Sequence, residues 1–469
     1  MLLRLSPPLS SSAVPDRPLD TDPVTSEREA ERLSPAPPVP AAGSSPPAGM
    51  RRLLRMATID TGPLRRHRDF RLLFAGQGIS FLGSMVTYVA LPYQAYQISG
   101  SSLVVGLLGI AELCPLLVTA FLGGALADAR DRRRMLLLTE LSLAVASGVL
   151  LANAALPHPQ LWLLFVVSAA MAGLDGLQRP SLEALTPRLV DRDEIPAASA
   201  ISSFRMTIAM IAGPALGGIL IAGFGLPLTY GFDVLTFLIS LLLLRRLRAA
   251  PPASDQATVS LRSIAEGIRY AGGRQVLLGT YTVDIVAMFF GMPMALFPAF
   301  AHEFGGAGVL GLMYAAPSVG SMLATLTSGW TSHMHRHGAA ICFAAGGWGL
   351  AVAAAGLAPN LELALLGLAA AGAADMISGI FRSTVWNQTI PDELRGRLAG
   401  IEQVSYSTGP LLGNVESGLA ASLVGVRGAI VSGGVLCVAG VVVAAIALPT
   451  FWRYEASDEP VAAVPAATG

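Results

Sequence analysis

The chain has 469 residues and no net charge, because 31 basic residues, all of them arginine, balance 31 acidic ones. Hydrophobic residues make up 53% of the chain and charged residues 13%, about half the charged share of a soluble domain. The zero net charge argues against a nucleic-acid partner. The absence of lysine excludes a Walker A phosphate loop and Schiff-base chemistry. We therefore expect a membrane protein that is driven by a gradient rather than by its own hydrolysis of ATP.

The first 62 residues are rich in Pro, Ser, Ala and acidic side chains and show no apolar periodicity. Such a segment cannot bury enough surface to fold, so we predict a disordered tail over residues 1–62. It lacks the apolar core of a signal peptide. Met50 and Met56 are alternatives to Met1 as the start of translation, because the basic residues within 65–71 are enough to orient the first apolar segment.

Twelve apolar segments follow, with lengths suited to helices that cross a bilayer. They predict an all-α membrane protein with two sets of six helices, at residues 63–248 and 276–452. Between the sets lies a linker, 249–275, whose stretch 260–271 has the pattern of an amphipathic interfacial helix. A second disordered tail is expected at 453–469. The predicted segments are 72–96, 103–127, 135–156, 161–183, 197–222, 227–244, 276–300, 308–331, 339–357, 362–386, 401–423 and 428–450.

Arginine is distributed unevenly over the connections between these segments. It occurs at both ends of the apolar region and in the connections after even-numbered segments, whereas connections 97–102, 157–160, 223–226 and 358–361 contain none. Only Arg427 goes against this pattern. Because basic residues beside a membrane helix stay on the cytoplasmic side, we predict a multi-pass protein of the cell membrane with both termini in the cytoplasm.

A short polar connection, GGALADARDRRR at residues 123–134, joins the second and third segments. It resembles the loop between helices two and three of the major facilitator superfamily of transporters, although Ala129 stands where a basic residue is usual and Asp131 where glycine is usual. The resemblance implies that this loop is a conformational switch. The alternative is an ordinary basic turn that only orients its neighbours. The motif residues are Gly124, Asp128, Arg130, Arg132 and Arg133.

The two sets of segments repeat each other weakly. GPALGG at 213–218 recurs as GPLLG at 409–413, and the stretch 178–194 is echoed by 381–397. Small residues let helices approach closely and proline bends them, while repeated halves related by a pseudo-two-fold axis are typical of two-bundle transporters. The first copy resembles the antiporter motif of exporters in this superfamily, with plain helix packing as the alternative. Its residues are Gly213, Pro214, Gly217 and Gly218.

Three stretches narrow the resemblance within the superfamily. Residues 70–98, 305–338 and 381–413 are similar to the branch that contains the enterobactin exporter and macrolide and multidrug exporters. The run GLMYAAPSVGSMLATLTSG at 311–329 is the most specific of them. The resemblance implies export, and it indicates the direction of transport better than the substrate.

Ionisable residues inside apolar segments are costly and usually face a cavity or a partner. Asp175, Arg179 and Glu183 have the i, i+4, i+8 spacing of one helix face and can form an ion pair. Asp375 and Arg382 lie seven residues apart on the equivalent segment. The resemblance implies that both groups face the substrate path or the inner gate. The alternative is a salt bridge that locks the two halves together.

Proton exchange requires an acid with apolar surroundings and periodic access to water. Asp284 is the first candidate, because its neighbours at 283–288 offer no counter-charge, and Glu112 is the second. The alternative is that Asp284 only packs against a neighbouring helix. Asp233, Glu402 and Glu416 are further acids without an obvious local partner. Candidate residues for lining a cavity are Gln77, Tyr88, Tyr93, Gln94, Tyr281, Trp386 and Gln388.

Together these features predict a secondary transporter that exports a small, partly apolar organic molecule, siderophore-like or antibiotic-like, in exchange for protons. The alternatives are a metabolite importer and a sensor or scaffold that has lost transport. No catalytic triad, metal-ligand quartet or cofactor loop occurs, so we expect neither an enzyme nor a bound metal or cofactor. His333, His335 and His337 are interpreted as solvated. The expected partners are the substrate, protons and the lipid bilayer, and we expect a monomer.

Overall fold

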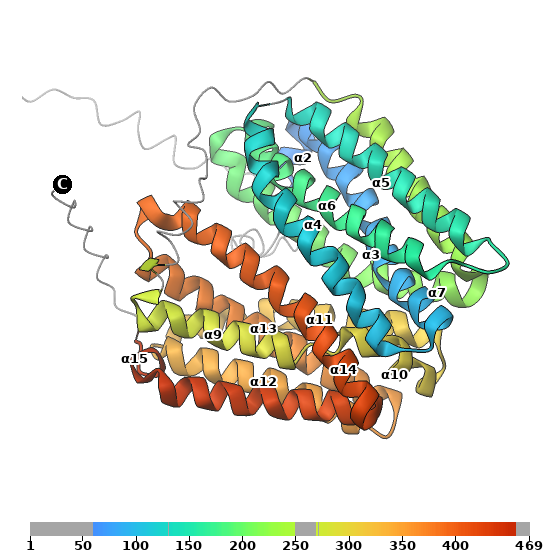
Figure 1. Ribbon diagram of the computed structural model, residues 1–469. Coiled ribbons are helices and arrows are strands. Elements are labelled where there is room, and N and C mark those ends of the chain that lie inside the picture. Colours follow the sequence, from blue (N-terminus) through green and yellow to red (C-terminus); the bar gives the residue numbers. More distant parts are fainter. Residues whose placement is uncertain (1–59, 130, 249–268, 271, 456–469) are drawn as a thin grey trace, which may run out of the picture. The chain divides into compact units, whose positions relative to one another are not determined.

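Long apolar helices make up nearly all of the computed structural model (Figure 1). It describes residues 60–129, 131–248, 269, 270 and 272–455, with only the backbone at 120–129, 184 and 392–405. Most of the predicted interfacial helix at 260–271 and most of the two predicted tails lie outside the described residues.

The described elements follow the predicted segments closely. In the first part of the chain they are α2 (Gly62–Arg66), α3 (Arg68–Ser99), α4 (Ser102–Ala129), α5 (Arg132–Ala154), α6 (Leu161–Leu185), the 3-10 turns η2 (Thr186–Arg188) and η3 (Arg192–Glu194), and α7 (Ile195–Leu244). In the second part they are α9 (Gln275–Phe290), η4 (Met294–Leu296), α10 (Phe297–Phe304), α11 (Ala307–Leu326), η5 (Ser328–His333), α12 (His337–Leu357), α13 (Leu361–Thr389), α14 (Asp392–Ala447) and α15 (Pro449–Trp452).

Ten helical stretches among the described residues are long and apolar enough to cross a membrane. Two of them are much longer than one crossing needs, at 53 residues for Arg192–Leu244 and 42 for Tyr406–Ala447. Each contains a kink at a glycine, and φ is 77° at both Gly225 and Gly425. Residues other than glycine rarely adopt a positive φ. These kinks coincide with the predicted breaks between the fifth and sixth and between the eleventh and twelfth segments.

The predicted segment 276–300 is not one continuous helix. α9 ends at Phe290, and η4 and α10 follow only after a break at Gly291 and Pro293. Proline supplies no N–H for a helical hydrogen bond. The indole Nε1 of Trp348 donates a hydrogen bond to the carbonyl of Gly291 at 3.0 Å, so α12 satisfies a backbone group that the break leaves free.

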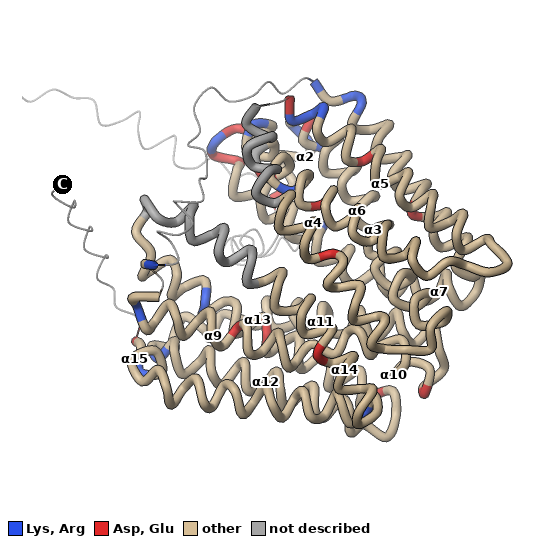
Figure 2. The backbone as a smooth tube through the Cα atoms, in the orientation of Figure 1, with Lys and Arg blue, Asp and Glu red and all other residues tan. Residues whose placement is uncertain are grey.

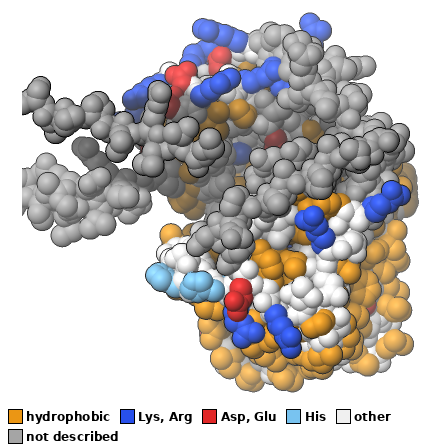
Figure 3. Space-filling view, turned by 90° about the vertical axis from the view of Figure 1, so that its left-hand side faces the viewer, with side chains coloured by type: hydrophobic (Ala, Val, Ile, Leu, Met, Phe, Trp, Pro, Cys, Tyr) orange, Lys and Arg blue, Asp and Glu red, His pale blue; other side chains and the backbone are white. Residues whose placement is uncertain are grey.

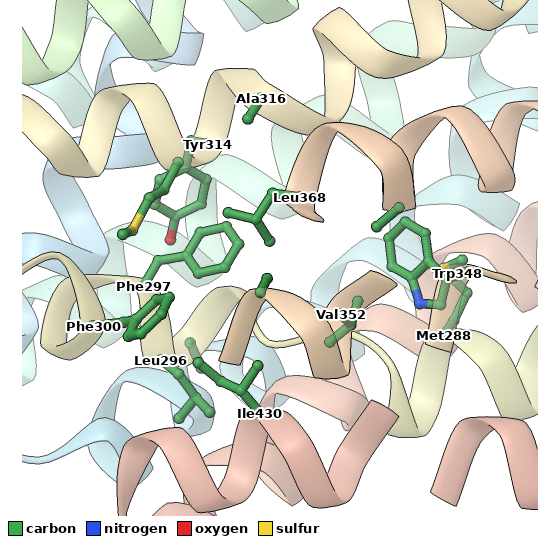
Figure 4. Packing of buried hydrophobic residues seen from close by; sticks show 14 of the residues in the cluster. Met288, Leu296, Phe297, Phe300, Tyr314, Ala316, Trp348, Val352, Leu368 and Ile430 are labelled. Atoms are coloured by element: carbon green, nitrogen blue, oxygen red, sulfur yellow. The ribbon is translucent and has the colours of Figure 1, made fainter. Parts of the chain in front are cut away.

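Buried apolar side chains hold the helices of the second part together (Figure 4). Phe297 of α10 meets Tyr314 of α11 edge to face at 5.1 Å, and Leu368, Val352 and Ile430 fill the space between α13, α12 and α14. In the first part, α3 packs against α7 and α4 against α6. Such packing is the main attraction between helices whose outer surfaces are as apolar as lipid.

Charged residues are sparse along the helices and gather near their ends (Figure 2). The face seen in Figure 3 carries several arginine side chains, and hydrophobic side chains cover much of the surface beside it. Exposed apolar residues also occur along many of the helices, Ile219, Leu242 and Val443 among them. A surface of this kind suits contact with lipid rather than with water.

The glycines of the motif at 213–218 lie where helices meet. Gly213 and Gly217 face Leu82 and Val86 on α3, and Gly218 faces α11. A Cβ added at Gly218 would lie 2.8 Å from the Ala307 carbonyl oxygen. The close approach of helices follows the prediction from the glycine spacing, whereas the role of the motif in antiport stays a prediction.

The second copy of this motif makes equivalent contacts. Gly409 and Gly413 pack α14 against Met288 and Phe289 of α9, as Gly213 and Gly217 pack α7 against α3. A Cβ added at Gly413 would lie 2.7 Å from the Phe289 carbonyl oxygen. The repeat in sequence is therefore also a repeat in helix contacts.

Asp233, an acid without an obvious local partner in the sequence, takes the two closest hydrogen-bond donors to its carboxylate from other helices. The side chain is fully buried on α7, where Oδ2 accepts hydrogen bonds from Thr87 of α3 at 2.6 Å and Ser147 of α5 at 2.7 Å. Both donors come from other helices, so no pattern within α7 could reveal them. Gly83 leaves room for this carboxylate, because a Cβ there would lie 2.5 Å from Oδ1.

We expect Gly218→Ala to destabilise the fold by about 1–3 kcal/mol, because the added methyl group meets backbone atoms of α11 that cannot move aside easily. The measurement is the midpoint of thermal unfolding of the purified protein. Gly223→Ala is the matched control, since a Cβ at Gly223 on the same helix has no neighbour within 4 Å. Equal midpoints for the two variants would contradict the prediction.

We expect Asp233→Ala to lower the same unfolding midpoint strongly, because it leaves two buried hydroxyl groups without an acceptor, at about 1–3 kcal/mol each. Glu183→Ala is the control. It removes a carboxylate whose ion pair is exposed, and such pairs contribute only about 0–1 kcal/mol. A loss of stability in the Glu183 variant as large as that in the Asp233 variant would refute this account.

Candidate functional site

Arg382 of α13 lies between two carboxylates inside the membrane-spanning part of the chain. Its Nη1 forms an ion pair with Asp284 of α9, and its Nη2 lies 3.7 Å from Oδ1 of Asp375, two turns earlier on α13. The side chains of Arg382 and Asp284 are 2% and 3% exposed, whereas that of Asp375 is 39% exposed. We call these three residues the charged triad. One permanently charged group thus lies beside two acids, one almost fully buried and one partly exposed.

The expectation that Asp284 has no counter-charge is wrong. Its sequence neighbours offer none, but the counter-charge comes from α13, far along the chain. The structure does bring Asp375 and Arg382 together, as their spacing predicts. The roles of these residues in gating and proton coupling stay predictions.

Three aromatic rings flank the charged triad. Tyr281 of α9 and Trp386 of α13 stack at 5.5 Å, and Trp386 Nε1 donates to Thr280 Oγ1 at 2.9 Å. Tyr406 of α14 packs edge-on to Trp386, and the Arg382 guanidinium lies 5.2 Å from the centre of its ring. A cation over an aromatic face is an attractive contact. Tyr281 and Trp386 were predicted from the sequence, but Tyr406 was missed, although it lies only three residues before the second glycine-proline copy.

The first part of the chain has no equivalent of this buried triad among the described residues. Arg179 of α6 pairs with Glu183 at 3.3 Å, and their side chains are 52% and 71% exposed. The shared face of Asp175, Arg179 and Glu183 thus carries an ion pair, as their spacing predicts, and among the described residues Arg179 forms it with the later of the two acids. The spacing indicated the shared helix face but not which partner is chosen.

Glu140 of α5 is a buried acid that the sequence reasoning missed. Its Oε1 accepts hydrogen bonds from Gln77 at 2.6 Å, Ser80 at 3.1 Å and Gln178 at 3.0 Å. Gln77 therefore binds another side chain rather than lining a cavity as predicted. The feature of the sequence that could have indicated this buried cluster is the set of polar residues inside the apolar segments of α3, α5 and α6.

The other cavity candidates lie at separate places. Tyr93 and Gln94 line a cavity of about 250 Å³ beside the kink at Gly225. Tyr88 donates to the Met294 sulfur at 3.0 Å, and Gln388 accepts from the hydroxyl of Tyr454 at 3.3 Å. The structure therefore does not gather all seven candidates around one cavity. Glu112, the second proton-coupling candidate, lies partly buried on α4.

Part of the predicted switch loop lies in the described structure. Arg132 is buried, and Arg133 Nη2 donates to the carbonyl of Arg245 at 2.5 Å. Asp131, which departs from the superfamily pattern, caps the start of α5 by accepting from the backbone N–H of Arg133 at 2.9 Å. The side chains of Asp128 and Arg130 lie outside the described residues, as does any contact they make, and Gly124 is described only as backbone.

His67 and His337 bear on the predictions that no metal is bound and that the histidines of loop 333–337 are solvated. His67, Asp191 and Glu194 come close enough to offer three ligand atoms, although Glu194 also pairs with Arg66 at 2.7 Å. The absence of a metal therefore stays a prediction. His337 is buried, with Nε2 3.0 Å from the Met334 carbonyl oxygen, so the expectation that it is solvated is wrong.

The sequence matches known transporters along most of its length. A family described as transmembrane secretion effector matches residues 59–466. The enterobactin exporter EntS of Citrobacter koseri is 29% identical over 379 residues, which cover 80% of this chain and 91% of that protein. EntS of Shigella boydii is also 29% identical, over 386 residues that cover 81% and 91%.

Solved structures show the same fold at low sequence identity. The nucleoside transporter NupG superposes with a TM-score of 0.67 and 15% identity, covering 82% of this chain and 99% of its own. A bacterial homologue of the iron transporter ferroportin, in an inward-facing state, gives a TM-score of 0.62 and 15% identity, with coverage of 82% and 98%. Family and relatives are transporters, not enzymes. The chain is a multi-pass membrane protein that belongs to the transmembrane secretion effector family of major facilitator superfamily transporters.

Proposed function

We propose that this protein is a secondary transporter of the cell membrane that exports a small organic molecule, siderophore-like or drug-like, in exchange for protons. The charged triad is the observation that carries the proposal. The names of the 29% identical relatives, enterobactin exporters, support the direction of transport and the class of cargo.

The triad has the charge balance that proton exchange requires. Arg382 keeps its charge, so the triad carries one net negative charge when Asp284 and Asp375 are both ionised. A net charge among membrane helices is unfavourable, and one proton on either acid removes it. The Asp375 side chain is 39% exposed, whereas that of Asp284 is almost fully buried, so Asp375 is the acid of the triad that we propose exchanges protons with water. A conformational change that alters the access of Asp375 to water on one side of the membrane would therefore favour uptake or release of a proton by the triad.

The topology that we propose is two six-helix bundles related by a pseudo-two-fold axis. Ten stretches of the described residues are long and apolar enough to cross a membrane, and counting the two that bend at Gly225 and Gly425 as two crossings each gives the twelve helices that we propose. The bundles comprise 63–248 and 276–452, with the linker 249–275 between them. The repeated contacts of the two glycine-proline motifs support this arrangement. The positions of the arginines support cytoplasmic termini.

We expect Asp284→Asn to abolish proton release driven by substrate, because the triad is then neutral without a proton. Exchange of substrate down its own gradient continues. The measurement uses everted membrane vesicles with enterobactin, the cargo named for the relatives. The matched control is Glu303→Gln, which removes a carboxylate from a half-exposed ion pair with Arg427. An Asp284 variant that still concentrates substrate as the parent does would refute this role and make Glu112 the next acid to test.

We also expect Asp128→Asn to reduce efflux severely while the amount of protein in the membrane is unchanged. A carboxylate at the end of α4 is suited to accept hydrogen bonds from the free N–H groups at the start of a facing helix and so to hold the cytoplasmic side closed. Asp131→Asn is the control, because asparagine also caps a helix well. Near-parental efflux in both variants would show that the motif does not act as a switch here.

A further inference from the structure

Arg205 is an arginine within the apolar first half of α7 that no sequence pattern singled out. It lies ten residues after Ile195, the first residue of the helix, or about 15 Å along the helix axis. Its Nε is buried and has no hydrogen-bond partner. None of the ion pairs formed among the described residues includes Arg205.

The surroundings of Arg205 hold its side chain in place, but no carboxylate of the described residues pairs with its charge. A Cβ at Gly78 of α3 would lie 3.2 Å from Arg205 Cδ, so the aliphatic part of the side chain lies against bare backbone. The guanidinium lies 5.9 Å from the centre of the Phe74 ring. That contact stabilises a cation only weakly at this distance. The residue as a whole is partly exposed.

Arg382 and Arg205, which both lie within membrane helices, thus differ in their surroundings. Arg382 has two carboxylates beside it, whereas Arg205 has none among the described residues. A guanidinium stays charged at any pH that proteins tolerate, and its cost inside a membrane is offset only by a partner or by water. An arginine held in place without a carboxylate remains available to bind an anion from outside the chain.

We propose that Arg205 and Phe74 form an anion-binding site between α3 and α7 for an ionised oxygen group, such as a carboxylate or phenolate, of an aromatic cargo. The guanidinium pairs with the anionic group and the Phe74 ring contacts the aromatic body beside it. This inference rests on the proposed export function and assigns the charge of the cargo. A lipid phosphate offers the same chemistry as a ligand, so the experiment has to separate the two sources.

The test measures equilibrium binding to the purified protein, without a membrane gradient. The probes are salicylate and its uncharged amide, salicylamide. We expect the parent to bind salicylate more tightly than salicylamide, and Arg205→Gln to lose at least tenfold in affinity for salicylate alone. Arg205→Lys keeps the charge but not the planar fork, and should retain part of the preference. Arg248→Gln, which removes a highly exposed arginine, should bind both probes as the parent does.

Three results would overturn the proposal. In the first, the parent protein shows no preference for salicylate over salicylamide. In the second, the Arg205→Gln variant keeps the full preference while its thermal unfolding midpoint is unchanged. The third is loss of co-purified phospholipid from Arg205→Gln, detected by native mass spectrometry, without loss of salicylate binding, which would assign Arg205 to a lipid phosphate. Because no step of the test requires export or a proton gradient, its outcome is independent of the vesicle experiment on Asp284.

Discussion

The ion pair between Arg382 and Asp284 is the interaction on which the interior of the second half depends. It joins α13 to α9 where both side chains are almost completely buried, and it draws Asp375 and three aromatic rings to the same place. Ions in such surroundings are stable only when they are paired and held in position, which fixes how these helices pack. The pair therefore constrains the structure and also concentrates titratable groups at one point.

Buried acids in the two halves are stabilised in different ways. Among the described residues, Asp233 and Glu140 accept hydrogen bonds from hydroxyl and amide groups, while Asp284 pairs with an arginine. Neutral donors leave the charge of an acid in place, whereas an arginine cancels it. The halves share their glycine-mediated contacts but not their electrostatics. In the two proposals above, proton exchange lies in the second half and recognition of an anion lies at Arg205 in the first.

Small residues decide how closely the halves approach. Gly109 of α4 faces the backbone of Leu411, and Gly418 of α14 faces Ser102, as Gly218 faces Ala307. Contacts between backbones of this kind exclude larger side chains and contain few charged groups that would hold them rigidly. They are suited to surfaces that separate and re-form during a transport cycle, whereas the buried ion pair ties helices within one half.

The sequence by itself determined the membrane-spanning helices, the breaks near Gly225 and Gly425, and the small-residue contacts. Each of these follows from a local pattern: a run of apolar residues, a glycine between two runs, or glycines four residues apart. Only the tertiary structure decided that Asp284 pairs with Arg382, that Gln77 binds Glu140, and that Arg205 has no carboxylate beside it among the described residues. These depend on which helices become neighbours. Helix packing determines which residue pairs with a charged side chain inside a membrane. The residues nearby in sequence do not indicate that partner.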